Sequence, residues 1–244
     1  MNDYRPSTYG EQIAEVYDQL YPGVEAAALD LIVEFAKGGR ALELGVGTGR
    51  FAIPLSQRGV PITGVDASEA MLAKLRAKPG SEAIETHLAD FSDFSLGKKY
   101  KLVYIPFNTI FAALTQRSQI QLFSCAAAHL EPQGCFLVEA FVPDLSRFTR
   151  GQNLTLLDAD GGGVHIDATQ LDSTNQILTG QHIFLSEKGA RLYPVKLRFA
   201  YPPELDLMAR LAGLTLKNRW GGWDKREFTA ESSKHISTYS LESA

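Results

Sequence analysis

The 244-residue chain lacks several features that would assign it to a specialised class. Its two cysteines, Cys125 and Cys135, form neither a disulfide framework nor a zinc-binding spacing, so we expect reduced thiols in a cytoplasmic protein. The net charge of −4 offers no basic surface for nucleic acid or an anionic membrane. No run of 18 apolar residues is present, and the polar N-terminus lacks the apolar segment of a signal peptide. What remains is an ordinary globular composition, 45% hydrophobic and 21% charged.

Short apolar segments alternate with helical patterns over the first 146 residues. Helical patterns occupy residues 50–59, 68–78 and 116–134. The segments between and beside them are short, apolar and bounded by turn residues, which predicts strands. These strands are expected near residues 40–45, 61–66, 84–89, 101–106 and 134–141. Buried strands that alternate with helices predict an α/β fold with a doubly wound, mostly parallel sheet.

The flanking segments have a different character. Apolar residues at helical spacing predict a helix over 9–21, and a second helix is expected between Pro22 and Gly39. After residue 146, short strands separated by Gly, Asp and Asn predict an antiparallel meander, followed by a helix and two last strands. We expect one domain, in which 1–39 is helical, 40–146 forms the α/β core, 147–200 is the antiparallel elaboration and 201–244 completes the core.

The stretch "ALELGVGTGR" at residues 41–50 places glycines at the end of a buried strand. Such a loop lets the backbone approach a ligand closely. A dinucleotide-binding loop needs a third glycine where this chain has Arg50, and the Gly-Lys-Ser/Thr of a phosphate loop is absent. The pattern is instead Glu43, Gly45, Gly47 and Gly49, an acid followed by three alternate glycines.

This pattern resembles motif I of the class I S-adenosylmethionine-dependent methyltransferases, although the family usually has aspartate where this chain has Glu43. The resemblance extends to "ITGVDASEAML" and "HLADFSDF", each at the end of a following strand. It implies a Rossmann-like fold with a seven-stranded sheet, and S-adenosylmethionine as cofactor. Three acids at consecutive strand ends converge on one crevice of an open parallel sheet.

In this resemblance each acid has its own partner on the cofactor. Glu43 holds the ammonium directly or through water, Asp66 the ribose hydroxyls and Asp90 the adenine amino group. Taken alone, Asp66 could instead help to cap the helix after Ser68, and Asp90 could belong to a plain turn. The implied cofactor contacts are Tyr17, Glu43, Gly45, Gly47, Gly49, Asp66, Ala67, Met71, Asp90, Phe91 and Phe107.

The methyl acceptor leaves a weaker signature. The fourth core strand ends in "VYIPFNTIF". This stretch lacks the Asp/Asn-Pro-Pro-Tyr/Phe pattern of enzymes that act on DNA amino groups or protein glutamine. It also lacks the acid that binds magnesium in catechol-type O-methyltransferases. We therefore expect no metal. Asn108 is a candidate for the crevice, with a helix N-cap as the alternative.

Two further segments resemble bacterial amino-sugar and peptide N-methyltransferases. "YDQLY" places Tyr17 and Tyr21 on a helical lid over the cofactor and acceptor, although the same residues suit the core face of an amphipathic helix. "RWGGWDKREFT" supplies Trp223 and Asp224, and with them Trp220, as a candidate acceptor wall. The catalytic candidates are thus Tyr17, Tyr21, Asn108, Trp223 and Asp224. The histidines form no local cluster, and His165 or His182 remains only a minor alternative as a base.

The sequence therefore predicts a methyltransferase of small-molecule biosynthesis that acts on a small molecule or short peptide, most simply on an amine nitrogen. O-methylation and a non-catalytic cofactor-binding protein are the alternatives, and Arg50 argues against a nicotinamide enzyme. We expect a monomer or homodimer with no nucleic-acid or membrane partner. The acceptor pocket lies in the segments with the fewest motifs, so the acceptor itself cannot be named.

Overall fold

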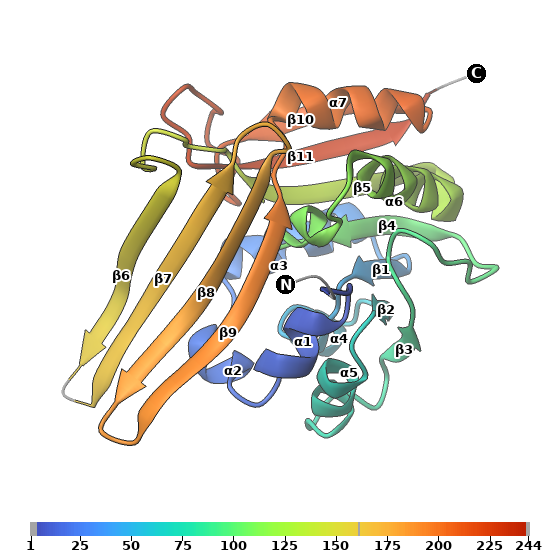
Figure 1. The fold of residues 1–244 in the computed structure, drawn as a ribbon. Helices are drawn as coiled ribbons and strands as arrows, with labels where there is room; N and C mark the ends of the chain where they lie inside the picture. Colours follow the sequence, from blue (N-terminus) through green and yellow to red (C-terminus); the bar gives the residue numbers. More distant parts are fainter. Residues whose placement is uncertain (1–3, 161, 243–244) are drawn as a thin grey trace.

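The computed structural model describes residues 4–160 and 162–242. It contains a seven-stranded sheet in the order β10-β11-β5-β4-β1-β2-β3 (Figure 1). Strands β1 to β5 pair in parallel, whereas β11 is antiparallel to both β5 and β10. The strands are β1 (Ala41–Leu44), β2 (Ile62–Asp66), β3 (Glu85–Leu88), β4 (Tyr100–Ile105), β5 (Leu130–Phe141), β10 (Leu214–Trp220) and β11 (Lys234–Leu241). The predicted doubly wound, mostly parallel sheet is confirmed.

The strand order reverses beside β1. The chain runs from β1 to β2 and β3 on one side and then crosses to β4 on the other. Because parallel crossovers are right-handed, this reversal places helices on both faces of the sheet. One face packs against α3 (Ala26–Ala36), α4 (Ala52–Gln57) and α5 (Glu69–Arg76). The other packs against η1 (Thr109–Ala112), α6 (Gln116–His129) and α7 (Pro202–Leu211). Ligands of such folds bind at this reversal, at the carboxyl ends of the strands.

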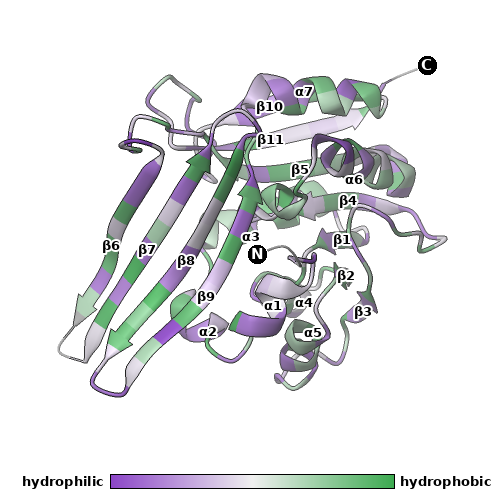
Figure 2. Ribbon diagram, in the orientation of Figure 1, coloured by the Kyte–Doolittle hydropathy of each residue, from purple (hydrophilic) through white to green (hydrophobic). Residues whose placement is uncertain are grey.

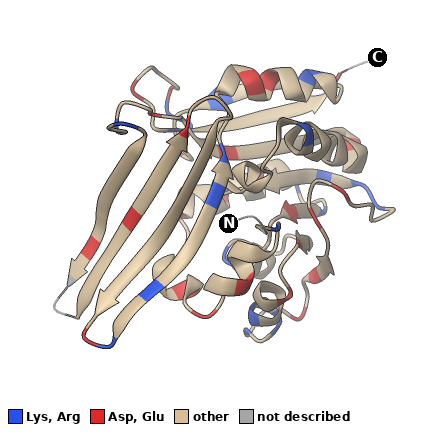
Figure 3. Cartoon of the chain, viewed as in Figure 1, with Lys and Arg blue, Asp and Glu red and all other residues tan. Residues whose placement is uncertain are grey.

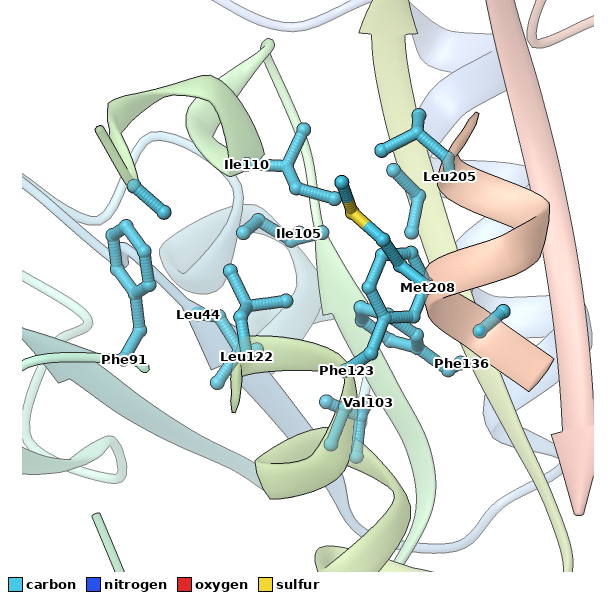
Figure 4. Packing of buried hydrophobic residues seen from close by; sticks show 14 of the residues in the cluster. Leu44, Phe91, Val103, Ile105, Ile110, Leu122, Phe123, Phe136, Leu205 and Met208 are labelled. Atoms are coloured by element: carbon cyan, nitrogen blue, oxygen red, sulfur yellow. The ribbon is translucent and has the colours of Figure 1, made fainter. Parts of the chain in front are cut away.

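The central strands are buried on both faces, which explains their continuous apolar sequences. In β1, Leu42 and Leu44 belong to the core beneath α6 and α7, and Ala41 to the core beneath α3 and α4. Figure 4 shows the first of these cores, where strand residues meet helix residues. The labelled side chains include Leu44, Val103, Ile105, Phe136, Leu122, Phe123, Leu205 and Met208. Two carboxylates interrupt this apolar interior, Glu43 at 2% and Glu139 at 6% exposure.

A second, four-stranded antiparallel sheet is inserted between β5 and α7 (Figure 1). It is a simple meander of β6 (Gln152–Asp160), β7 (Gly163–Asp172), β8 (Ile177–Ser186) and β9 (Gly189–Arg198). Hydrophobic and hydrophilic residues mix along these strands in Figure 2, as expected for a sheet that is partly exposed. The antiparallel elaboration predicted from the sequence is confirmed.

The N-terminal helix differs from the prediction. Instead of one helix over 9–21, the chain forms α1 (Thr8–Ile13) and the single turn α2 (Tyr17–Leu20). The break includes Val16, a β-branched residue with φ −116° and ψ −5°. It lets Ile13 stay buried against Met71 while Tyr17 and Tyr21 turn toward the end of β1. Helix α3 likewise starts at Ala26 rather than at Pro22, because Gly23 has φ +67° and leads the chain away from helical geometry.

Charged side chains of both signs are interspersed over the molecule (Figure 3). Between residues 4 and 242, leaving aside residue 161, no helix combines the length and apolarity needed to cross a membrane. The same described residues contain no group of three or more His, Cys, Asp or Glu side chains arranged to hold a metal ion.

Candidate functional site

A cavity of about 290 Å³ lies at the carboxyl ends of β1 and β2, beneath α1, α2 and β9. Most of the residues predicted to contact the cofactor line it: Tyr17, Gly45, Gly47, Asp66, Ala67, Met71, Phe91 and Phe107. These residues come from α2, from the end of β2, from the loops after β1, β2, β3 and β4, and from α5. The structure thus gathers at one place residues that are separated by up to 90 positions in the sequence.

The three glycines after β1 all have positive φ, but their surroundings differ. A Cβ at Gly45 would lie 2.4 Å from Cγ2 of Thr109, and one at Gly49 would lie 2.9 Å from Cγ of Leu75. At Gly47 a Cβ would meet no protein atom within 4 Å, because it would project into open space. Gly45 and Gly47 line the cavity, whereas Gly49 packs between α4 and α5 and does not.

Asp66 fastens the glycine loop to the end of β2. Its Oδ2 accepts a hydrogen bond from the backbone N–H of Gly47 at 2.8 Å, and its Oδ1 accepts one from Ser68 at 2.9 Å. Ser68 caps α5 through its own Oγ, which accepts from the N–H of Met71. Burial raises the pKa of the Asp66 carboxyl, and the backbone N–H donors partly offset this effect. Asp66 therefore supports the loop and also lines the cavity.

Glu43 is buried behind the cavity and is not part of its wall. Its Oε2 accepts a hydrogen bond of 2.7 Å from the Tyr104 hydroxyl. Desolvation raises the pKa of Glu43 to about 8, although the Tyr104 bond and the charge of Arg50 lower it. A buried carboxyl with so high a pKa gains from a cation brought close to it.

Asp90 also lies outside the cavity wall. Its Oδ1 accepts from the N–H of Ser92 at 2.8 Å and from the Ser92 hydroxyl at 2.7 Å, which is the turn that the sequence left as an alternative. The next residue, Phe91, is buried and does line the cavity.

The N-terminal helices are tied to the loops that form the cavity floor. Asp18 accepts from the Thr48 hydroxyl at 2.6 Å and pairs with Lys78 at 2.7 Å. Glu11 accepts from the Ser68 hydroxyl at 2.9 Å. Asp18 is the acid of "YDQLY", so this motif anchors the tyrosines on either side of it above the glycine loop.

Aromatic rings form the wall opposite the glycine loop. The ring of Tyr21 lies 5.0 Å from that of Tyr17 and 5.1 Å from that of Phe107. Tyr9 also lines the cavity. Burial raises the pKa of the Tyr17 hydroxyl, which therefore remains protonated at neutral pH. Tyr9 was not among the residues predicted from the sequence, although Tyr9, Tyr17 and Tyr21 recur at intervals of about two helical turns and one helical turn.

A second cavity, of about 540 Å³, adjoins the first and shares Phe107 and Asn108 with it. Both shared residues have the left-handed backbone conformation, with φ +56° and +62°. Glu139 stabilises this strained turn through two hydrogen bonds. Its Oε2 accepts from the backbone N–H of Phe107 at 2.6 Å, and its backbone carbonyl accepts from the backbone N–H of Asn108. Its Oε1 accepts from the indole N–H of Trp223 at 3.0 Å, so Trp223 becomes part of the wall.

The predicted acceptor residues have mixed outcomes. Asn108 lines both cavities, and its side chain accepts from the N–H of Phe141 at 2.6 Å instead of capping η1. Asp224 is placed elsewhere, because it is exposed and paired with Arg226 at 2.8 Å, two residues along the chain. Trp220 packs on Phe35 and lines neither cavity.

Comparison with known proteins gives a consistent result. A methyltransferase domain family matches residues 41–134. The CcbJ methyltransferase of Streptomyces caelestis is 39% identical, covers 98% of this chain and all of its own, and superposes with a TM-score of 0.92. The chain belongs to the class I S-adenosylmethionine-dependent methyltransferases.

Two further relatives are less complete or more distant. The dTDP-3-amino-3,6-dideoxy-alpha-D-glucopyranose N,N-dimethyltransferase of Streptomyces fradiae is 30% identical over 54% of each chain, so the match spans about half the length of this curated relative. CalS10, an amino pentose methyltransferase of Micromonospora echinaspora, is 20% identical over 91% of this chain and 96% of its own, with a TM-score of 0.70, and shares the fold.

One more residue of this methyltransferase reaches the cavity from the second sheet. His182 on β8 lines it, and its Nε2 lies 3.4 Å from the Tyr21 hydroxyl. His182 was only a minor candidate from the sequence, because the strand pairing that brings it to α2 leaves no local motif.

We predict that Gly47→Ala weakens adenosylhomocysteine binding by about tenfold or more, because the added methyl group enters the cavity. Gly59→Ala is the matched control, since Gly59 also has positive φ with no atom within 4 Å of a Cβ, but lies in an exposed turn. Both variants should lose stability by about 1–2 kcal/mol from left-handed strain. Calorimetry and thermal melts separate the two effects. Equal affinities of both variants would contradict the position of the site.

Proposed function

We propose that this methyltransferase transfers a methyl group to an amine nitrogen of a small molecule or short peptide. The observation that carries the proposal is the aromatic wall of Tyr17, Tyr21 and Phe107 facing the glycine loop across one cavity. Electron-rich ring faces stabilise cations, and N-methylation turns a neutral amine into a cationic ammonium. A hydroxyl that remains protonated, as in Tyr17, can orient an amine lone pair by donating to it.

The residues present suit S-adenosylmethionine, which supplies a methyl group already activated on a sulfonium. In this proposal, the open space at Gly47 takes its methionine portion, and Asp66 accepts from the ribose hydroxyls. Ala67 and Met71 then border the adenine, with Phe91 at its edge. Arg50 stands 3.9 Å from the ring centre of Phe107, where a dinucleotide loop would need its third glycine.

The acceptor occupies the space between the aromatic wall and the second cavity. Asn108 and Phe107 border both spaces, and Trp223 borders the outer one. This arrangement leaves the remainder of the acceptor in the outer cavity. The Streptomyces fradiae relative is an N,N-dimethyltransferase of an amino sugar, which supports nitrogen as the target atom. The monomer or homodimer and the cytoplasmic location expected from the sequence stay predictions.

Glu43 is proposed to hold the cofactor's ammonium group, directly or through water. With a pKa of about 8 in the free protein, it must lose a proton to become the anion that the ammonium favours. Affinity for the cofactor should therefore rise by about tenfold per pH unit below pH 8, and fall above it as the α-amino group itself deprotonates. In Glu43→Gln, which can still accept from Tyr104, calorimetry should find weaker binding without this rise. A pH-dependent rise retained in the variant would refute the role.

The proposed reaction is tested by incubating the chain with methyl-labelled cofactor and a panel of primary and secondary amines, phenols and carboxylates. Turnover of an amine is expected, with a rate that increases toward the amine's own pKa because only the neutral amine attacks. Tyr17→Phe should lower kcat while leaving the fold intact, since it removes one hydroxyl and little volume.

Tyr201→Phe is the control for this variant, because Tyr201 lies at the start of α7, away from both cavities. Turnover of phenols alone would favour O-methylation. Cofactor binding without turnover of any acceptor would favour a binding protein.

A further inference from the structure

Three polar side chains form a continuous line from the cavity to the outer part of the second sheet. The Tyr21 hydroxyl lies 3.4 Å from Nε2 of His182, and Nδ1 of His182 lies 3.3 Å from Nε2 of His165. Tyr21 and His182 line the cofactor-side cavity. His165 and Tyr21 line a separate cavity of about 620 Å³ between α2 and the second sheet. The rings of His182 and His165 therefore connect the cofactor-side cavity with the cavity between α2 and the second sheet.

The strand register fixes this geometry. His165 on β7 and His182 on β8 belong to neighbouring strands, and His182 lies directly opposite Asp167 on one side and Tyr193 on the other. The ring of His165 stacks on Phe184 at 3.9 Å, which holds it in place. Two imidazoles linked nitrogen to nitrogen need one donor and one acceptor in each contact. The contacts are satisfied if Tyr21 donates to His182 and His182 donates to His165.

The surroundings keep both rings neutral and able to accept a proton. Burial lowers the pKa of His182, and burial followed by the charge of His182 lowers the pKa of His165. Nearby carboxylates oppose the effect and stabilise a proton that arrives: Asp167 acts on both rings and Asp158 on His165. The titratable or charged groups that face the pair are Tyr21 of α2, Asp158 of β6, Asp167 of β7 and Tyr193 of β9.

We infer that Tyr21, His182 and His165 form a proton relay that carries the proton of the methylated nitrogen to the cavity between α2 and the second sheet. This inference rests on the proposed amine acceptor and adds the path by which the acceptor's proton leaves. It also accounts for the second sheet, whose β7 and β8 supply the outer two members of the relay.

A bond forms between the acceptor nitrogen and the methyl carbon as the bond from that carbon to sulfur breaks, which leaves a thioether and an ammonium. The ammonium proton passes to the Tyr21 oxygen while the Tyr21 proton passes to Nε2 of His182. The Nδ1 proton of His182 passes to Nε2 of His165, which becomes the cation and releases a proton to water. The nitrogen lone pair is thereby restored for release or for another methylation.

A measurement on the free protein tests the relay without any acceptor. Long-range ¹H–¹⁵N spectra of the imidazoles, assigned with His165→Gln and His182→Gln, reveal which ring nitrogen carries the proton. The relay requires His182 to be protonated at Nδ1 and unprotonated at Nε2 near neutral pH, and the proportion of this tautomer should fall in Tyr21→Phe. A His182 ring protonated at Nε2 in the wild type would overturn the proposal.

A kinetic measurement tests its use. With an amine that the wild type methylates, His182→Gln should lower kcat by about 10²-fold while adenosylhomocysteine affinity is unchanged. At acidic pH the wild-type rate should fall more steeply than protonation of the amine alone requires, because the histidine pair must also be neutral. This additional fall should be absent in His182→Gln, which keeps only the fall set by the amine. His87→Gln is the matched control, since His87 lies on β3 and pairs with Glu85 outside the cavities.

Wild-type kcat with an unchanged pH profile in His182→Gln would overturn the relay even if amines are methylated. Because the tautomer is measured with no acceptor present, a wrong acceptor class affects only the kinetic arm. Failure of the relay and failure of the proposed function are thus distinguishable.

Discussion

The carboxylate of Asp66 joins the two loops from which the cofactor cavity is built. One oxygen accepts from Gly47 in the loop after β1, and the other from Ser68 at the start of α5. Both loops leave adjacent parallel strands. The loop after β1 is rich in glycine and therefore has few side chains to hold it. Two charge-assisted hydrogen bonds from one largely buried carboxylate therefore define the cavity floor.

The rest of the site is built onto this floor from distant segments. Helix α1 reaches it through Glu11 and Ser68, and Asp18 reaches it through Thr48. On the other side, Glu139 holds the strained turn at Phe107 and Asn108 together with the Trp223 indole. Acidic side chains thus hold the N-terminal helices, the loops after β1 and β2, and the turn beside Trp223 in place. They do so mostly by accepting hydrogen bonds from hydroxyl and N–H groups. The tyrosines and His182 can then meet across a cavity whose borders are already fixed.

The sequence was sufficient where function depends on local spacing. The strands of the core, the glycine loop and Asp66 follow from short motifs with a fixed place at the ends of parallel strands. The sequence was insufficient where a residue's role depends on a partner far away in the chain. Nothing near Glu139 distinguishes it from any acid in a strand, and its role depends on a tryptophan 84 residues away.

The positions of two further residues depend on contacts that the sequence pattern does not reveal. Asp224 was expected in the acceptor site from a motif, but a local ion pair with Arg226 turns it toward solvent. His182 lacked a motif, and the register of β7 and β8 with the position of α2 brings it to the cavity. The helical periodicity over 9–21 also did not reveal the break at Val16. Apolar spacing shows which face of a helix is buried, but it does not show where the helix axis changes direction.

The most direct test of the account is calorimetric binding of S-adenosylmethionine to the wild type and to Asp66→Asn. The substitution keeps the volume of the Asp66 side chain but removes its negative charge. It also replaces one of the two oxygens that accept from the backbone N–H groups of Gly47 and Ser68. The account predicts that the wild type binds the cofactor and that Asp66→Asn loses about 2–3 kcal/mol of binding free energy. Asp93→Asn, an exposed residue beyond β3, should bind as the wild type does. Equal affinity of the wild type and Asp66→Asn would contradict the account.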